Sequence, residues 1–359
     1  MSWIRRDVRR RYRQAIEPQR HRDTEKFNLS LPNFKLLRPR TVQEATGYLG
    51  RYAGAIQILA GGTDLLPSMR QRLFAPEYLM DISGIEELKK IRIAAGAGAE
   101  VGALTTLSAI EDSGSIARDY PVLHEAAKTV ASPILRNMGT LGGNICLDTR
   151  CVWYNQSLTW RKSCGFCIKK DGDLCHVAPG GTKCWAAFSA DTPPALLCLN
   201  AEIEVAGPNG VQRLPLRDLY TGEGDARLKL ANNELLTRVF LPETSRGWRG
   251  AYVKLRIRGS IDYPLAGVAV ALKKPNGKIE DARVAITAVN PAPYMVPEAM
   301  HALAGKSAGE IEHAAAVVGE LAARIAKPLT TSALTPEYRR EMVKVFAKRA
   351  VMKAATLET

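Results

Sequence analysis

The chain has no long apolar run, and this absence excludes one class of protein at the outset. None of its hydrophobic stretches approaches the ~20 residues that a membrane-spanning helix needs. No apolar core follows the arginines of the first segment, MSWIRRDVRRRYRQ, so the sequence shows no signal-peptide pattern. With 359 residues, 46% hydrophobic and 24% charged, we expect a cytoplasmic globular protein of two or more domains.

Cysteine is absent from most of the chain. All seven cysteines lie between Cys146 and Cys198, and no signal sequence accompanies them. A disulfide framework of the secreted type is therefore not expected. In an intracellular chain, cysteines gathered in one segment indicate metal or redox chemistry.

The sequence also lacks the signatures that would link its positive charge to nucleic-acid recognition. Its net charge is +14, and residues 1–26, with nine basic and four acidic side chains, contribute +5 of it. No RNA-recognition signature and no zinc-finger spacing accompany this charge. We therefore interpret 1–26 as a basic N-terminal extension, solvated or wrapped around a partner, and expect no nucleic-acid binding.

Neither common glycine fingerprint for nucleotides is present, yet two other glycine turns are. AGGTDLL (60–66) follows the apolar run 56–59, and GTLGGN (139–144) lies further along the chain. Neither turn contains the lysine of a P-loop, so hydrolysis of a nucleoside triphosphate is not expected. Glycines let backbone N–H groups approach a diphosphate, and a following helix adds partial positive charge. Together the two turns predict a diphosphate cradle.

Hydrophobic patterns predict an α/β first half of the chain. A capping box at Thr41 begins one helix, and strands at 55–60 and 78–83 flank a helix from Asp64 to about Leu73. Such a β-α-β unit is expected to have parallel strands. The segment 138–148 is predicted to be a glycine turn that runs into a strand.

The second half of the chain is predicted to be α+β. A domain boundary is expected near 241–247, which separates a domain at 27–244 from one at 245–359. Strands are expected at 251–258, 266–274 and 281–289. Alanine-rich helices then follow from about Ile311 and from Pro336.

Five segments carry a resemblance to a known family. They are LPNFKLLRPRTVQEA, LAGGTDLLPSMR, RNMGTLGGNICLD, DTPPALLCLNAEIEV and VKLRIRGSIDYPLAGVAV. Together they resemble the FAD-binding medium subunit of the molybdenum hydroxylase family, which includes xanthine dehydrogenase and carbon monoxide dehydrogenase. The resemblance runs from about Phe27 to about Ala350. It implies a two-part FAD-binding α/β region of the PCMH type, followed by an α+β domain with an antiparallel sheet and helices.

The resemblance also implies which residues bind FAD. Those that it assigns to the diphosphate cradle are Leu59, Ala60, Gly61, Gly62, Thr63, Asp64, Leu65, Leu66, Gly139, Thr140, Gly142, Gly143 and Asn144. Val130 and Leu236 match positions that line the cofactor. Asp191 matches a carboxylate that bonds ribose or adenine-side hydroxyls. Lys254 matches a lysine near the isoalloxazine ring, where a cation would stabilise reduced, anionic flavin; without the resemblance it reads as a solvated lysine at a strand end.

A cysteine-rich insertion at about 147–188 departs from the family pattern, which runs almost directly from GGNI to DxxPAL. The segment is too polar to fold alone, so a metal centre is expected to hold it together. Its spacing leaves the ligands open. Cys164 and Cys167 form a C-x-x-C pair that suits zinc or a redox motif. Cys146 and Cys198 are expected to be buried, inert thiols, and His176 an exposed loop residue.

One branch of the family resolves this choice by resemblance. The segments LDTRC, YNQS and WRK, and the cysteine pattern after them, are similar to the 4-hydroxybenzoyl-CoA reductases, whose insertion binds an extra 4Fe–4S cluster. The cysteines matched to its ligands are Cys151, Cys167, Cys175 and Cys184, one per iron. Cys164 is not among them. Zinc stays as the alternative metal.

The resemblance implies one subunit of a larger oxidoreductase. The chain has no molybdopterin-binding signature and no plant-type 2Fe–2S cysteine run, so a large molybdenum-cofactor subunit and a small 2Fe–2S subunit are implied as partners, in a dimer of heterotrimers. In the reductase branch, electrons from ferredoxin would pass through this chain to the molybdenum site, where 4-hydroxybenzoyl-CoA is dehydroxylated reductively to benzoyl-CoA. The alternatives are the FAD subunit of another molybdenum hydroxylase, acting on a different aromatic or heterocycle, and a zinc-stapled binding module.

Overall fold

The computed structural model describes residues 30–356, so the basic extension predicted at 1–26 lies outside the described residues. None of the helices within this range has the length and the apolar character needed to cross a membrane.

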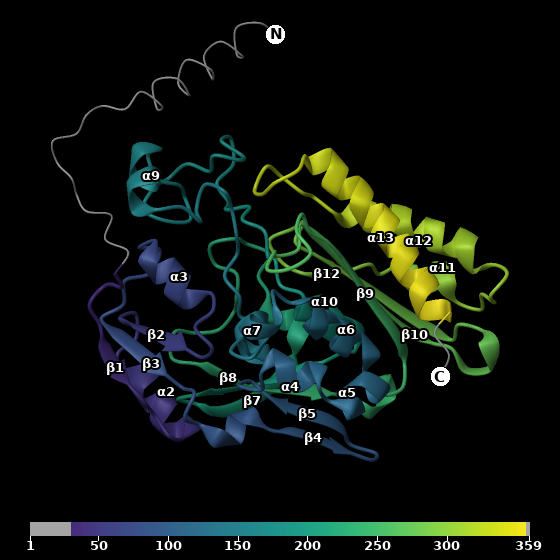
Figure 1. The fold of residues 1–359 in the computed structure, drawn as a ribbon, viewed down its shortest axis with the longest axis horizontal. Coiled ribbons are helices and arrows are strands. Elements are labelled where there is room, and N and C mark those ends of the chain that lie inside the picture. Colours follow the sequence, from purple (N-terminus) through teal and green to yellow (C-terminus); the bar gives the residue numbers. More distant parts are fainter. Residues whose placement is uncertain (1–29, 357–359) are drawn as a thin grey trace, which may run out of the picture. The chain divides into compact units, whose positions relative to one another are not determined.

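A small parallel sheet confirms the predicted β-α-β unit. Its strands are β1 (Lys35–Leu37), β2 (Ile56–Leu59) and β3 (Tyr78–Asp81), in the order β1-β3-β2 (Figure 1). Helix α2 (Val42–Arg51) begins at Thr41, whose hydroxyl accepts the Glu44 N–H at 3.1 Å, and it buries Ala45 and Leu49. Helix α3 (Leu65–Arg70) begins directly after the first glycine turn and leads back towards β3. The edge of this sheet therefore carries the first candidate site.

A five-stranded antiparallel sheet and a group of short helices complete the first half. The strands are β4 (Ile91–Ala94), β5 (Gly98–Gly102), β6 (Glu202–Gly207), β7 (Gly210–Pro215) and β8 (Leu235–Leu241), in the order β4-β5-β8-β6-β7. The helices are α4 (Leu107–Glu111), α5 (Gly114–Asp119), α6 (Pro121–Thr129), α7 (Pro133–Arg136), α8 (Leu141–Ile145), α9 (Leu158–Ser163) and α10 (Thr192–Cys198). In Figure 1, α6 and α10 lie between this sheet and the next one. Their side chains join the two sheets in one core.

The second half is an antiparallel sheet with helices on one face, as predicted. Its strands are β9 (Arg249–Leu255), β10 (Ala266–Lys273), β11 (Asp281–Thr287) and β12 (Tyr294–Met295), in the order β12-β11-β10-β9. Helices α11 (Ala299–Leu303), α12 (Ile311–Ile325) and α13 (Pro336–Thr356) lie beside it (Figure 1). Short 3₁₀ helices elsewhere are η1 (Glu86–Lys89), η2 (Leu216–Leu219), η3 (Glu243–Ser245) and η4 (Pro275–Gly277).

Strand β10 shows why the two halves pack together. Side chains alternate between the faces of a strand. Val268, Val270 and Leu272 belong to the core under α12 and α13, whereas Ala269 and Ala271 belong to the core shared with α6 and α10. Because both faces are buried, β10 is apolar throughout. The small alanines let the helices of the first half approach closely.

The strand predicted after the second glycine turn is wrong. Residues 141–145 form the short helix α8, with Thr140 as its N-cap and Cys146 as its C-cap. The Thr140 hydroxyl accepts the Gly143 N–H at 3.1 Å, which starts the helix. A short apolar run such as Leu141 to Leu147 does not distinguish a buried helix from a strand by its pattern. Correspondingly, Cys146 ends a helix instead of lying within a strand.

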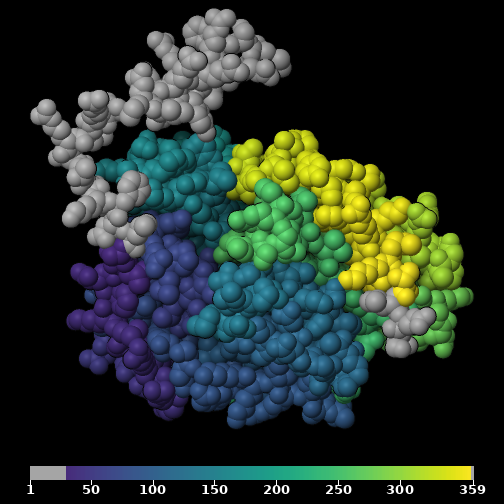
Figure 2. Space-filling model, in the orientation of Figure 1, coloured from purple at the N-terminus to yellow at the C-terminus, as the bar shows by residue number. Residues whose placement is uncertain are grey.

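The cysteine-rich insertion has little regular structure apart from α9. Its two ends are joined, because Arg150 and Ala187 exchange backbone hydrogen bonds of 2.8 Å in both directions. The Val152 N–H also donates to the Thr331 carbonyl at 2.8 Å. Figure 2 shows the insertion (teal) at the surface, beside the yellow segment that contains Thr331 and α13. The insertion therefore contacts both halves of the fold.

Candidate functional site

The first glycine turn offers a row of unused backbone donors. From Gly61 to Leu65, no backbone N–H donates a hydrogen bond to any other residue of the described range 30–356. Gly62 has a φ of +71°, a left-handed conformation that favours glycine. Successive N–H groups in such a turn form a concavity that suits an anion. The turn therefore has the donors that a diphosphate requires.

The second glycine turn has the same composition, but its donors are already used. The N–H groups of Leu141 and Gly142 donate to the carbonyls of Thr105 and Ala103 at 2.9 and 2.8 Å. Gly143 donates to the Thr140 hydroxyl, and Asn144 to the Thr140 carbonyl at 2.9 Å. The backbone N–H groups of residues 141–144 are therefore not free in this structure, and their role in FAD binding stays a prediction. Their glycines serve packing: a Cβ added at Gly142 would lie 2.8 Å from the Cβ of Ala103.

The two turns nevertheless lie against each other. A Cβ added at Gly61 would stand 1.8 Å from the Met138 carbonyl oxygen, so this contact admits only glycine. A Cβ added at Gly139 would lie 3.8 Å from the Thr63 hydroxyl. The structure thus joins Leu59–Leu66 and Gly139–Asn144 into one unit. Within it, the first turn faces outward with its donors, and the second supports it.

Asp191, at the N-cap of α10, lies in a buried ion pair with Lys254 of β9. The Lys254 Nζ is 3.1 Å from Asp191 Oδ1, and the two side chains are 3% and 4% exposed. Tyr252 donates its hydroxyl to the same carboxylate at 2.8 Å. Burial raises the pKa of Asp191, and the attraction of Lys254 opposes that shift. Lys254 is therefore not the solvated lysine at a strand end that the sequence alone favoured.

This ion pair joins two residues that were expected at different parts of FAD. Asp191 was expected at the ribose or adenine side, and Lys254 near the isoalloxazine ring. The carboxylate and the ammonium group are in direct contact, and both roles stay predictions. Asn144 lies next to this cluster, because its side-chain oxygen accepts the Thr192 N–H at 3.0 Å.

Val130 and Leu236 occupy positions in and beside the core. Leu236, in β8, is 5% exposed, and Val130, the C-cap of α6, packs against the same core. The Val130 carbonyl accepts a hydrogen bond from Arg136 at 2.9 Å. The next residue, Ala131, accepts the Ile261 N–H at 2.8 Å, which brings the end of α6 to the loop between β9 and β10.

That loop and the insertion each bring one unpredicted residue to the first glycine turn. Tyr263 donates its hydroxyl to Asp64 Oδ1 at 2.9 Å, and Arg150 of the insertion donates to the same oxygen at 2.9 Å. The Arg150 guanidinium also stacks over the Tyr263 ring, 4.1 Å from its centroid. In the sequence, Tyr263 and Arg150 lie 199 and 86 residues from Asp64. Only the DYP segment, part of the family resemblance, could have drawn attention to Tyr263.

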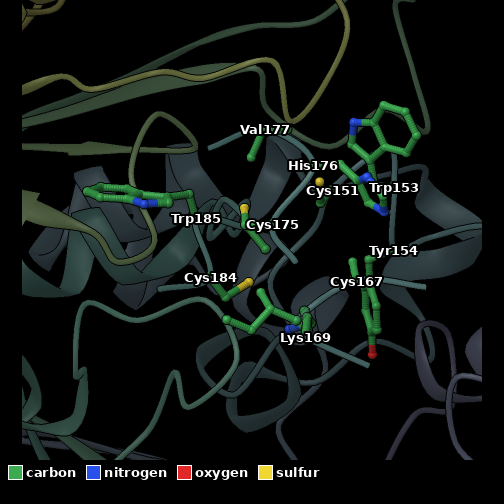
Figure 3. Close-up of a pocket in the computed structure, with 12 residues that line it drawn as sticks. Cys151, Trp153, Tyr154, Cys167, Lys169, Cys175, His176, Val177, Cys184 and Trp185 are labelled. Atoms are coloured by element: carbon green, nitrogen blue, oxygen red, sulfur yellow. The ribbon is translucent and has the colours of Figure 1, made fainter. Parts of the chain in front are cut away.

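The insertion places four of its cysteines around one small cavity. The cysteines that line it are Cys151, Cys167, Cys175 and Cys184 (Figure 3). Each has an exposed fraction of 8% or less. Burial raises the pKa of the Cys151 thiol to about 11 and that of the Cys184 thiol to about 12. The four residues matched to the cluster ligands thus converge, although up to 33 residues separate them in the sequence.

The remaining cysteines lie elsewhere. Cys198 is fully buried in α10, and Cys146 is half-buried; burial raises the pKa of both thiols. Cys164 is the C-cap of α9 and does not line the cavity. His176 does line it and stacks on Trp153, with ring centroids 4.5 Å apart, so its prediction as an exposed loop residue is wrong.

A buried cation also lies at the wall of this cavity. Lys169, which is 5% exposed, pairs with Asp148 at 2.9 Å and donates to the Gly224 carbonyl at 2.7 Å. Burial acts to raise the pKa of Asp148, but Lys169 and Arg227 outweigh it and hold that pKa below its usual range. No group of three or more His, Cys, Asp or Glu side chains among residues 30–356 is arranged to hold a single metal ion.

Comparison with known families matches nearly all of the described chain. Residues 32–244 match the FAD-binding domain found in molybdopterin dehydrogenases. Residues 251–354 match the C-terminal domain of CO dehydrogenase flavoproteins. The chain is an FAD-binding subunit of the molybdenum hydroxylase family.

Relatives and solved structures agree with this membership. The carbon monoxide dehydrogenase medium chain of Afipia carboxidovorans is 31% identical over 322 residues, 90% of this chain and 96% of that protein. The glyceraldehyde dehydrogenase medium chain of Sulfolobus acidocaldarius is 26% identical, over 90% of this chain and 99% of that protein. A chain of the Cu,Mo-CO dehydrogenase structure superposes with a TM-score of 0.73 at 28% identity, covering 91% and 99%. Quinoline 2-oxidoreductase from Pseudomonas putida 86 gives 0.72 at 26%, covering 91% and 98%.

The free donors of the first turn lie within the region that matches the FAD-binding domain. They are the N–H groups of Gly61 to Leu65, which have no partner among residues 30–356, and successive N–H groups of this kind suit an anion such as a diphosphate. The matched FAD-binding region, 32–244, spans both glycine turns and the whole cysteine-rich insertion. The cysteine-rich insertion therefore lies within the region that matches the FAD-binding domain.

Proposed function

We propose that this chain is the flavin and iron–sulfur subunit of a molybdenum enzyme of the 4-hydroxybenzoyl-CoA reductase type. Its insertion would hold a 4Fe–4S cluster on Cys151, Cys167, Cys175 and Cys184. Its partners would be a large molybdenum-cofactor subunit and a small 2Fe–2S subunit, in a dimer of heterotrimers, with ferredoxin as the electron donor. The aromatic acyl-CoA would be reduced on the large subunit.

One observation supports this proposal most strongly: four of the insertion's five cysteines line a common cavity, and Cys164 does not. A 4Fe–4S cluster takes four thiolates on separate irons, so its ligands stand further apart than those of a single ion. The four cysteines are buried around one cavity, which suits a centre held by four thiolates. Zinc, which also takes four thiolates, stays as the alternative metal.

The residues of this chain would hold and tune the cofactors. The N–H groups of Gly61–Leu65, with the Thr63 hydroxyl, would bind the FAD diphosphate. The Asp191–Lys254 pair would contact one end of the cofactor, with a buried cation held in place by a carboxylate. Bound FAD supplies the exchange of one or two electrons, and a cluster supplies the exchange of one. Burial of the cavity by Trp153, Tyr154 and Val177 would keep water from the metal centre.

Metal analysis of two matched cysteine variants tests the cluster. Cys151→Ser should lose about four irons and the accompanying acid-labile sulfide per chain, because one of four thiolates is removed. Cys164→Ser should lose none. Equal iron contents in the two variants, or zinc in place of iron, would refute the cluster.

Activity of the purified complex tests the reaction. The proposal predicts reduction of 4-hydroxybenzoyl-CoA by a low-potential donor. The second candidate, an FAD subunit that serves oxidation of another aromatic or heterocycle, is favoured by the names of the relatives, which include nicotine 6-hydroxylase and nicotinate dehydrogenase subunits. A panel of oxidisable aromatics with an electron acceptor separates the two. Turnover only in the oxidative direction would exclude the reductase.

A further inference from the structure

Helix α3 connects the two candidate cofactor sites, and arginines of the insertion hold both its ends. At its beginning, Arg150 donates to Asp64 at 2.9 Å. At its end, the Arg161 guanidinium donates to the carbonyls of Gln71 and Arg72 at 3.3 and 3.0 Å. Arg161 is 1% exposed, so its position is fixed by the surrounding protein. The helix that follows the first glycine turn is thus held at both ends by the cysteine-rich insertion.

Asp64 gives the first turn a negative charge, and Arg150 compensates that charge. Residues 59–66 contain Asp64 and no lysine or arginine, although the turn must accept a diphosphate. An uncompensated carboxylate next to two phosphates would repel them, because like charges at close range disfavour each other. Arg150 neutralises this carboxylate, and Tyr263 holds both groups in place. A P-loop carries a cation, its lysine, within its own turn. Here the cation is Arg150, which comes from the insertion.

The far end of α3 reaches the cysteine cavity. Leu73, which is 2% exposed, and Phe74 pack in one cluster with Cys151, Cys167 and Cys184. The segment from Leu65 to Phe74 therefore begins at the FAD turn and ends among the cysteines. The segment that follows the turn thus contacts residues at the FAD turn and residues of the cysteine cavity.

We propose that the insertion is a structural part of the FAD site, that Arg150 binds FAD by neutralising Asp64, and that FAD and the metal of the insertion bind cooperatively through α3. By linkage, each cofactor then raises the affinity for the other by the same factor. The role of Arg150 rests only on FAD binding. The cooperative part rests on the proposed metal centre.

The first test is a fluorescence titration of FAD into flavin-free, full-length chain. Arg150→Met should weaken FAD binding about tenfold, because the uncompensated Asp64 carboxylate then repels the diphosphate. Lys170→Met is the control, since Lys170 is an exposed insertion lysine that pairs only with the neighbouring Asp171. The double variant Arg150→Met/Asp64→Asn should recover most of the lost affinity, because the uncompensated charge is gone. Equal affinities for Arg150→Met and Lys170→Met, or no recovery in the double variant, would overturn the role of Arg150.

The second test measures FAD affinity of the wild-type chain before and after a chelator removes the metal. Cooperative binding predicts a loss of about fivefold or more. Arg161→Met should abolish that dependence, whereas Lys162→Met, the exposed neighbour on α9, should preserve it. If the FAD affinity is the same with and without the metal, the proposed coupling is wrong. A chain with no metal before chelation would refute the proposed cluster and its coupling, but not the role of Arg150.

Discussion

The two glycine turns have nearly the same composition, yet they use their backbones in opposite ways. The first turn leaves the N–H groups of Gly61–Leu65 without partners in the described part of the chain, whereas those of Leu141–Asn144 all have them. Asp64 of the first turn also accepts hydrogen bonds from side chains of two distant segments, the Arg150 guanidinium and the Tyr263 hydroxyl. Glycine content alone therefore does not identify a phosphate site. The number of backbone donors that the fold leaves unsatisfied distinguishes the two turns.

The largest effect should come from the contact between the turns. Gly61→Ala would place a methyl group on the Met138 carbonyl oxygen and force the turns apart, because neither partner is a flexible side chain. We expect a loss of about 3 kcal/mol in unfolding free energy and loss of bound flavin. Gly47→Ala is the matched control: a Cβ there meets nothing within 4 Å, and α2 should gain up to about 1 kcal/mol. Chemical denaturation and flavin absorbance measure both. A Gly61→Ala chain that keeps FAD would show that the contact is dispensable.

A second effect concerns the anchor beyond α8. Arg227 donates to the Leu147 and Cys146 carbonyls at 2.9 and 3.0 Å and pairs with Asp148 at 3.3 Å. Asp148→Asn would leave the buried ammonium group of Lys169 without its carboxylate and should cost about 3 kcal/mol at neutral pH. If the second turn has a structural role, Asp148→Asn lowers the free energy of unfolding. If Asp148→Asn lowers only the FAD affinity, that structural role is wrong.

The same anchor predicts a dependence on pH. Because the pKa of Asp148 is lower in the folded than in the unfolded protein, its contribution to stability is complete above about pH 4. It disappears as the pH falls towards the lower folded-state value. Wild-type unfolding free energy should therefore fall over that interval by more than that of Asp148→Asn. Parallel pH profiles for the two proteins would refute the assignment.

The smallest expected effects concern the threonine hydroxyls of the two turns, which we expect to have different roles. Thr140 caps α8, so Thr140→Val should cost about 1 kcal/mol of unfolding free energy and little FAD affinity. The Thr63 hydroxyl makes no hydrogen bond within residues 30–356, so Thr63→Val should leave stability unchanged. It should weaken FAD binding several-fold, equivalent to about 1 kcal/mol. Calorimetry of unfolding and FAD titration distinguish these outcomes. If Thr140→Val weakens FAD binding and Thr63→Val lowers stability, the roles assigned to the two turns are reversed.

Local sequence signals predicted most helices and strands, because a helix cap or a hydrophobic period is itself the physical cause of the element. The capping box at Thr41, the β-α-β unit around 56–81, and the helices from Ile311 and Pro336 all form where periodicity and caps place them. The prediction of a strand after the second glycine turn was wrong because the five residues LGGNI (141–145) have no decisive hydrophobic period. There, the cap at Thr140 and the carbonyls of Ala103 and Thr105 determine a helix.

The residues of the candidate site could be predicted only where they lie together in one segment of the chain. The AGGTDLL turn and the four cysteines of the insertion could be named from the sequence, the cysteines through a family branch. The Asp191–Lys254 pair, the Arg150–Asp64 pair and the position of Tyr263 could not, because they join segments 63 to 199 residues apart. Such contacts depend on how β9, β10 and the insertion pack, which no local pattern encodes.

Amide hydrogen exchange of the full-length chain, with and without FAD, tests the contrast between the turns most directly. The account predicts that FAD slows exchange at residues 61–65, whose N–H groups have no partner without it, and leaves 141–144 nearly unchanged. Protection that appears at 141–144 but not at 61–65 would contradict it.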